Sequence, residues 1–105
     1  MDEKEWALEH LRNDDPDRER VVTHWFYFAR KEDMDRLTVQ ALDQGYNVDS
    51  SSKLEGKERP WGLVLTDTHS VDFDTLIAKH ALLTRFAERF KGFYDGHEYA
   101  IEVSD

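Results

Sequence analysis

The histidines are the residues of this sequence best suited to chemistry. His24, His69 and His97 lie on or beside three different predicted strands, and three imidazoles, or two imidazoles and a carboxylate, can bind a transition metal. None of the histidines has another at the i+2 or i+4 spacing of local metal motifs. His24 and His80 interrupt apolar patterns, where a buried, hydrogen-bonded imidazole is commoner than a ligand. We therefore expect no metal-binding residue and no cofactor. The alternative is that the chain is a small histidine-based metal-binding protein.

Carboxylates are the second candidates. Asp67, Asp72 and Asp74 flank a predicted strand and the helix after it, and Asp95 and Glu98 lie on the last strand. Acid–base catalysis needs two such groups in unlike environments. With 23 acidic residues in 105, chance proximity explains the grouping. The chain also has no glycine-rich phosphate loop, no Gly-x-Ser-x-Gly motif and no dinucleotide fingerprint. We expect no catalytic residue and a protein that is not an enzyme.

The net charge of −9 restricts the class of partner. It opposes binding to phosphate backbones, which depends on lysine and arginine, and favours a basic protein partner. The absence of cysteine excludes disulfides and thiolate metal sites. The start, Met-Asp-Glu-Lys-Glu-Trp, lacks the apolar region of a signal peptide, and no apolar run approaches the ~18 residues of a membrane span. These features predict a cytoplasmic protein with no membrane contact and no direct contact with nucleic acid.

The helices and strands that must position these residues are expected to form one domain, residues 1–105. Residues 1–17 are expected to form an accessory helix, ended by Pro16, and a hinge. Residues 18–105 are expected to form the core. Its predicted elements are a strand at 21–29, a helix at 31–44, a strand from Tyr46, a hairpin loop at 53–59, a strand at 61–68, a helix from the Asp72 cap to Phe90, and a strand at 93–103.

This α-βαββαβ order predicts an α+β, ferredoxin-like antiparallel sheet with strand order 4-1-3-2 and both helices on one face. The last helix has apolar positions at helical spacing, expected to face the core: Phe73, Leu76, Ile77, Leu83, Phe86, Ala87 and Phe90. Gly92 is expected to end that helix. Asp95-Gly96 is expected to form a bend or bulge, because glycine tolerates backbone angles that other residues resist.

The first strand has large apolar groups on both faces, as expected of a central strand covered on each side. The sequence does not say which face is buried. Trp25 and Tyr27, with Tyr99 on a neighbouring strand, could form the base-stacking platform of an RNA-binding sheet. Acids outnumber bases, however, and the glycine-flanked aromatic signature of that module is missing. Packing of these rings under the N-terminal helix, through Trp6 and Leu8, is the favoured interpretation.

Three short motifs occur in a characteristic order. They are His24-Trp25-Phe26-Tyr27-Phe28 before a helix, Gly45-Tyr46-Asn47-Val48 at that helix's exit, and Tyr94-Asp95-Gly96 after a helix ending Ala87-Glu88-Arg89-Phe90. Together they resemble the regulator of ribonuclease activity B (RraB) family. The chain departs from the family in having His97 where members commonly have tryptophan, and in stopping at Ser104-Asp105 without a longer acidic tail. Arg30 or Lys31 stands at the cap of the second helix, where serine or aspartate is usual.

The resemblance implies a ferredoxin-like sandwich that binds ribonuclease E outside its catalytic chemistry and modulates RNA decay. The candidate partner-binding residues are Trp25, Tyr27, Tyr94, His97 and Tyr99. An immunity- or antitoxin-like inhibitor of another basic nuclease is the alternative, because the charge permits a nuclease partner without selecting one. The oligomeric state is not predicted.

Overall fold

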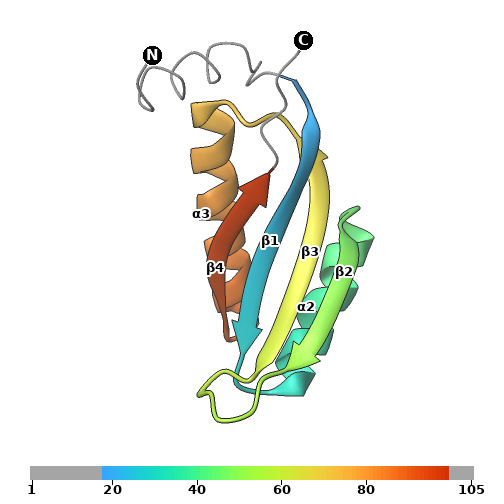
Figure 1. Cartoon of the computed structure of the whole chain (residues 1–105), viewed down its shortest axis with the longest axis vertical. Coiled ribbons are helices and arrows are strands. Elements are labelled where there is room, and N and C mark those ends of the chain that lie inside the picture. The colour runs from blue at the N-terminus through green and yellow to red at the C-terminus, as the bar shows by residue number, and fades with distance from the viewer. Residues whose placement is uncertain (1–17, 100–105) are drawn as a thin grey trace, which may run out of the picture.

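The computed structural model describes residues 18–99, which form four strands and two helices in βαββαβ order (Figure 1). The elements are β1 (Arg20–Phe28), α2 (Lys31–Asp43), β2 (Asn47–Lys53), β3 (Trp61–His69), α3 (Phe73–Arg89) and β4 (Gly92–Tyr99). They agree with the predicted elements to within a few residues. The accessory helix and hinge expected at 1–17 lie outside the described residues, as does the end of the last strand.

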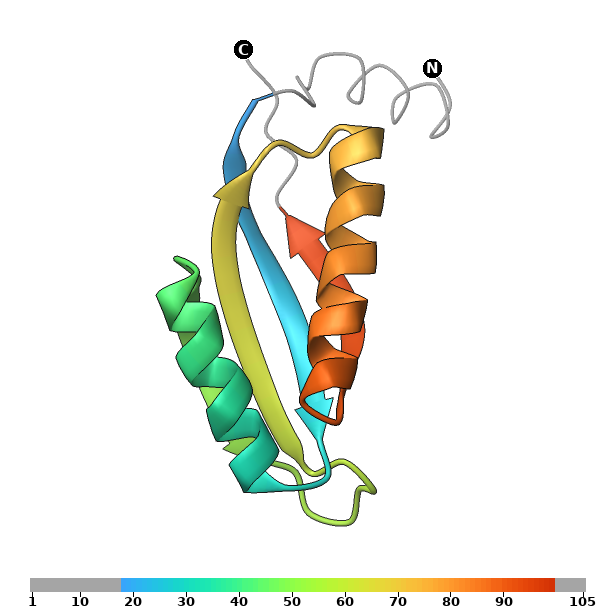
Figure 2. The ribbon, with the colours of Figure 1, turned by 180° about the vertical axis from the view of Figure 1, so that it is seen from behind.

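The four strands form one sheet in the order β2-β3-β1-β4, and each neighbouring pair is antiparallel. This is the predicted 4-1-3-2 order counted from the other edge. Figure 2 shows α2 and α3 side by side on the same face of the sheet, with α2 over β2 and β3 and α3 over β4. The predicted α+β ferredoxin-like architecture is therefore confirmed for residues 18–99.

The face of β1 that meets the helices carries Val22, His24, Phe26 and Phe28, all completely buried. The alternate residues, among them Trp25 and Tyr27, lie on the opposite face and are half-exposed. This difference settles which face of the strand is buried. The core cluster joins strands and helices through Phe26, Phe28, Met34, Leu37, Ala41, Tyr46, Leu63, Leu65, Leu83, Phe86, Ala87 and Tyr94.

Helix α2 presents a stripe of Met34, Leu37 and Ala41 to the sheet. Its N-cap is Arg30, which makes no side-chain capping hydrogen bond, as the missing serine or aspartate predicted. Acidic residues in the first turn favour the helix through its dipole. Gly45 stops it with a φ of +94°, a left-handed conformation that costs glycine little.

Helix α3 begins at the predicted cap, since the Asp72 carboxylate accepts a hydrogen bond from the Thr75 amide. Leu83 and Phe86 are buried as expected. The prediction for Phe73 and Ile77 is wrong: their exposed fractions are 76% and 53%. These two residues are four apart and share a flank of the helix turned away from the face that packs on the sheet. The apolar stripe of α3 is thus wider than the surface that it buries.

The exit from α3 differs from the expected glycine stop. The residue with positive φ is Lys91, at 60°, and Gly92 already belongs to β4. Gly92 is needed for space instead, because a Cβ atom there would overlap the ring of Phe28.

The predicted irregularity at Asp95-Gly96 is a β-bulge. Tyr94 pairs with Phe26 and Gly96 pairs with Trp25, so Asp95 is an extra residue without a partner in β1. Gly96 has a φ of +133°, which L-residues with a Cβ atom rarely adopt.

The backbone angle at Gly96 predicts a specific cost of adding a methyl group. Gly96→Ala should lower the free energy of unfolding by about 1–3 kcal/mol, because the strain arises from φ alone and nothing lies within 4 Å of the new Cβ. Urea unfolding measures the change. The matched control is Gly62→Ala in β3, whose Cβ would make an ordinary contact of 3.5 Å with Tyr27 and should change stability by less than about 1 kcal/mol. Equal effects at the two positions would contradict this assignment.

The unequal burial along α3 gives a second prediction. Phe86 is 7% exposed, so Phe86→Ala should cost roughly 3–5 kcal/mol of unfolding free energy through lost packing and the cavity left behind. Ile77→Ala on the exposed flank should cost less than about 1 kcal/mol. Comparable losses in chemical denaturation would show that the helix packs through a different face.

Candidate functional site

The five residues predicted to bind a partner lie on two faces of the sheet. Trp25 and Tyr27 are on the face away from the helices. Tyr94 pairs with Phe26 on the helix side and is only 5% exposed. His97 and Tyr99 also turn to the helix side, where they pair with buried residues of β1. We call the face with Trp25 and Tyr27 the open face, since no described helix covers it (Figure 1).

The bulge at Asp95 explains this division. In a regular strand, side chains at 93, 95, 97 and 99 would share one face. The extra residue reverses the alternation, so Phe93 pairs with Tyr27 on the open face while His97 pairs with His24 on the other. Tyr99 consequently cannot join the predicted aromatic platform, and that part of the expectation is wrong. Phe93, which had no predicted role, takes its place.

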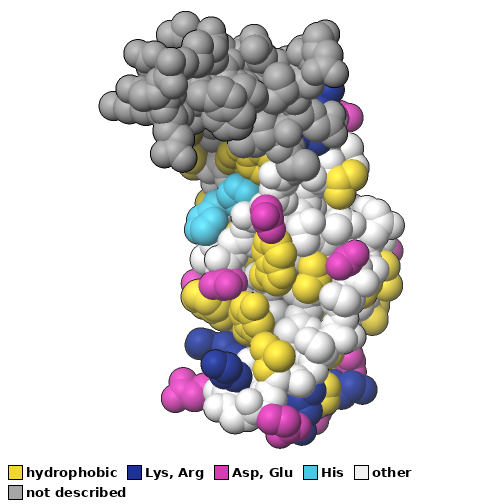
Figure 3. Space-filling model, in the orientation of Figure 1, with side chains coloured by type: hydrophobic (Ala, Val, Ile, Leu, Met, Phe, Trp, Pro, Cys, Tyr) yellow, Lys and Arg dark blue, Asp and Glu magenta, His cyan; other side chains and the backbone are white. Residues whose placement is uncertain are grey.

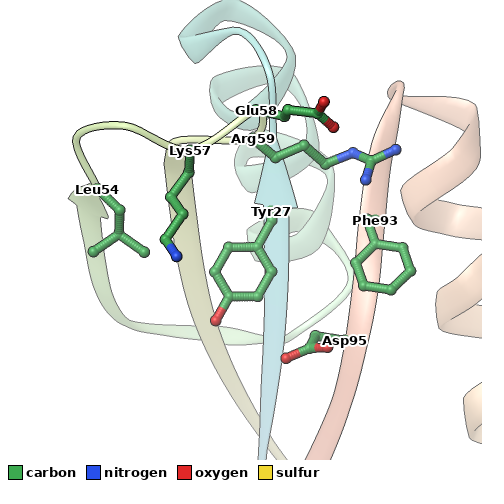
Figure 4. A pocket seen from close by; sticks show the side chains of 7 residues that line it. All are labelled: Tyr27, Leu54, Lys57, Glu58, Arg59, Phe93 and Asp95. Carbon is green, nitrogen blue, oxygen red and sulfur yellow. The ribbon is translucent and has the colours of Figure 1, made fainter.

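The open face is hollowed at the end near the β2–β3 loop. A depression of about 360 Å³ is lined by Tyr27, Leu54, Lys57, Glu58, Arg59, Phe93 and Asp95. Figure 4 shows the loop residues above and beside the Tyr27 ring, with Phe93 and Asp95 across from it on β4. The Arg59 guanidinium lies 5.4 Å from the centre of the Phe93 ring, within the range of a cation–π contact. Two rings and two cations thus surround a concave surface that can hold an apolar or aromatic side chain.

A polar cluster lies on the helix side of the same strands. His24 is fully buried, with its Nδ1 2.9 Å from the Tyr94 hydroxyl and its Nε2 2.7 Å from Asp67 Oδ1. Lys79 of α3 approaches the other carboxylate oxygen at 2.6 Å and also lies 4.6 Å from the centre of the Tyr46 ring. These contacts match the prediction that His24 is a buried, hydrogen-bonded imidazole. His80, for which the same was expected, is exposed on α3.

The charges of the cluster support one another. Burial would raise the pKa of Asp67, but hydrogen bonds from His24 and Lys79 outweigh it and hold that pKa below its ordinary value. Burial would likewise lower the pKa of Lys79, and its contact with Asp67 raises it instead. Burial raises the pKa of the Tyr94 phenol. Asp67 and Lys79 therefore form an ion pair at neutral pH, and Tyr94 keeps its proton.

His97 lies at the border of this cluster. Its ring is nearly parallel to that of Tyr99, at 6.2 Å, and is 6.4 Å from the ring of His24. Burial lowers the pKa of His97, and the neighbouring histidines lower it further. The imidazole is thus neutral at physiological pH.

The sequence singled out His24, Tyr27 and Asp67, but it did not predict that Asp67 contacts His24, and Phe93 and the loop cations were missed. Asp67 follows Leu63 and Leu65 in the alternation of β3, so it falls on the buried face of the strand. A single acidic residue at such a position indicates a buried polar contact, and this signal was present in the sequence. Phe93 and the loop cations had no comparable signal, because their meeting depends on the length of the loop and on the bulge.

The family model described as regulator of ribonuclease activity B matches residues 2–98. The chain belongs to this family. No curated protein matches it.

Membership in the regulator of ribonuclease activity B family supplies the biochemical role. The family consists of non-enzymatic regulators that inhibit ribonuclease E, and ribonuclease E is accordingly the protein partner of this chain. The predicted family, regulatory role and absence of enzyme activity are confirmed by this match. In the described part of the chain, no helix is long and apolar enough to cross a membrane.

The turn between β3 and α3 gives a pH prediction. Asp72 accepts hydrogen bonds from the Ser70 hydroxyl and from Thr75, and these bonds lower its pKa to about 2. A depressed carboxyl pKa stabilises the fold above the unfolded value of 3.8, and this contribution disappears as the pH falls through about 2. Asp72→Ala should therefore lower the melting temperature at pH 7, and its difference from the wild type should shrink between pH 4 and about 2.

Asp74→Ala is the control for this experiment. Asp74 is an exposed acid in the first turn of the same helix, so it tests the general effect of negative charge there. Thermal melts of both variants across the pH series separate the cap from the charge. Indistinguishable profiles would show that the hydrogen bonds of Asp72 add nothing.

Proposed function

We propose that this regulator binds ribonuclease E through the open face of its sheet, centred on Trp25, Tyr27 and Phe93. The observation that carries the proposal is the exposure of Phe93, at 46%, beside the Tyr27 ring and the hollow that both line. Large aromatic side chains beside a concavity are the usual anchors of protein interfaces. Figure 3 shows apolar side chains running along this face, with charged groups gathered around its lower end.

The surface around the anchors favours a protein ligand. The neighbouring strand β3 contributes smaller residues to this face, since Trp25 lies opposite Val64 and Tyr27 lies opposite Gly62. The aromatic rings consequently stand above their surroundings, where a complementary pocket or side chain of a partner can enclose them. Desolvation of such rings supplies most of the binding energy at an interface.

Charge contributes orientation and rate. Lys57 and Arg59 are balanced by Glu58 and Asp95 around the hollow, whereas the whole chain has a net charge of −9. A negative protein is steered toward a basic surface, and its locally balanced site then depends on shape and apolar contact. The same net charge disfavours RNA as the ligand of this face.

The other three candidate partner-binding residues, Tyr94, His97 and Tyr99, contribute less to the proposed interface. Tyr94 is packed in the core and bonded to His24, so its substitution would act on stability. His97 and Tyr99 belong to the outer strand β4 and could reach a partner only around its edge. We further propose that the chain acts as a single cytoplasmic domain, residues 1–105, without direct contact to nucleic acid or membrane.

The test is a titration of ribonuclease E with full-length variants, with binding and RNA cleavage both measured. Trp25→Ala and Phe93→Ala should each weaken binding about tenfold or more, because each removes an aromatic anchor. Inhibition of cleavage should decline in parallel. Leu82→Ala is the control, since Leu82 is 52% exposed on α3, on the helix side of the sheet.

Two results would contradict the open-face proposal. One is unchanged binding by both aromatic variants while the wild type binds, which would keep the family role and place the interface elsewhere. The other is salt-sensitive binding of RNA by the wild type that is lost in Trp25→Ala, which would make the face a nucleic-acid platform.

A further inference from the structure

Three potential metal ligands meet on the helix side of the sheet, apart from the open face. One ligand atom each from His24, Asp67 and His69 lies within 4.8 Å of the others. His24 comes from β1, and the other two are alternate residues near the end of β3. The sequence had suggested His97 as a third ligand. Within residues 18–99, the group that converges contains Asp67 in its place.

His69 lacks a partner that its chemistry requires. Its Nδ1 lies 2.6 Å from the Ser70 carbonyl oxygen, which can only accept, so Nδ1 carries the proton. The Nε2 atom of the neutral ring is then a bare lone pair. It lies 3.5 Å from Asp67 Oδ1, also an acceptor, and it is buried with no hydrogen-bond partner in the described structure. Two acceptors that face each other repel unless a proton or a metal ion lies between them.

The His24 ring can supply a second lone pair, on its Nε2 atom, directed at Asp67 Oδ1. Its Nδ1 meets the Tyr94 hydroxyl, which can either donate or accept a hydrogen bond. The ring proton can therefore move to Nδ1 without loss of that bond, and Nε2 becomes free to coordinate. A metal-ligating histidine usually donates its other N–H to a carbonyl or similar acceptor, and both rings have such a partner here.

Asp67 supplies the third donor. Lys79 occupies Oδ2 at 2.6 Å, which leaves Oδ1 directed at the two imidazoles. Metal-ligating carboxylates are commonly fixed by a hydrogen bond of this kind. The ammonium charge also opposes a nearby cation, so Lys79 should limit the affinity of the site.

We propose that His24, Asp67 and His69 form a binding site for a divalent first-row transition metal such as Zn²⁺. Bond lengths of about 2.0–2.2 Å in a tetrahedral site place neighbouring donors roughly 3.4 Å apart. The 3.5 Å between His69 and Asp67 already fits, and the 2.7 Å between His24 and Asp67 must widen. Two imidazoles and one carboxylate suit zinc better than calcium or magnesium. A hollow of about 460 Å³ is lined partly by Asp67 and Lys79, so one of the three ligands borders an open space.

This proposal does not depend on ribonuclease E, and purified protein tests it directly. Full-length protein is freed of metal by a chelator and titrated with Co²⁺, whose visible absorption reports tetrahedral coordination. We expect saturation at one Co²⁺ per chain and displacement by Zn²⁺. His69→Gln should weaken Zn²⁺ binding by about tenfold or more. His80→Gln is the control, because His80 is an exposed histidine outside the cluster.

A variant that keeps all three ligands guards against loss of fold. Lys79→Gln removes the competing charge and should bind Zn²⁺ several-fold more tightly than the wild type. Circular dichroism verifies that each variant is folded. The proposal is overturned if the wild type shows no saturable Co²⁺ or Zn²⁺ binding, which would mean that a proton alone lies between His69 and Asp67. Equal affinity in wild type and folded His69→Gln would overturn it as well.

Discussion

One extra residue in β4 determines which side chains this protein shows and which it hides. Because Asp95 has no partner in β1, the alternation of β4 reverses between Tyr94 and Gly96. Phe93 consequently remains outside, next to Tyr27. Tyr94 and His97 both turn toward the helices, although they stand three residues apart. The aromatic open face and the polar cluster behind it both follow from this bulge, which in turn depends on the backbone freedom of Gly96.

The polar cluster places hydrogen-bonded and charged groups in the interior of a small domain, where apolar residues are more common. A buried imidazole between a phenol and a carboxylate contributes less stability than apolar packing of the same volume, because all three groups lose water on folding. The cluster also requires each partner to be in place, since any orphaned group would carry its full desolvation cost. Its contacts join β1, β3, β4 and α3 through His24, Asp67, Tyr94 and Lys79. The arrangement of sheet and helix therefore depends on hydrogen-bond geometry as well as on apolar burial.

Local sequence signals predicted the fold well because they act over a few residues. The Asp72 cap, the Gly45 stop and the alternation of Leu63 and Leu65 each depend on neighbours in the chain, and the element order then restricts the topology to a few choices. The Asp95-Gly96 pair also predicted the bulge, but it did not predict which face the residues after the bulge would occupy. The direction of Tyr99 and His97 depends on pairing with a strand about 75 residues earlier in the sequence.

The candidate sites were harder to predict for the same reason. Asp67 and His24 are 43 residues apart, and their contact requires the β1–β3 register. The hollow needs a loop folded over β1, which no periodicity describes. Phe73 and Ile77 are exposed although they belong to the apolar pattern of α3. When an apolar pattern is wider than the buried face of a helix, the pattern alone does not show which of its residues are buried.

The two outer strands of the sheet have a consequence for how other chains can approach it. Both are interrupted: β4 at Asp95, and β2 at Asp49, where the pairing with β3 shifts between Val48 and Ser50. All of β2 is exposed, and apart from Val48 its residues are polar: asparagine, aspartate, serine and lysine. Such edges are poor templates for backbone-to-backbone strand addition, which would otherwise extend the sheet from one molecule to the next. A second polypeptide must therefore recognise this domain by its side chains, and concentrated solutions of it are protected from growth into sheet-like aggregates.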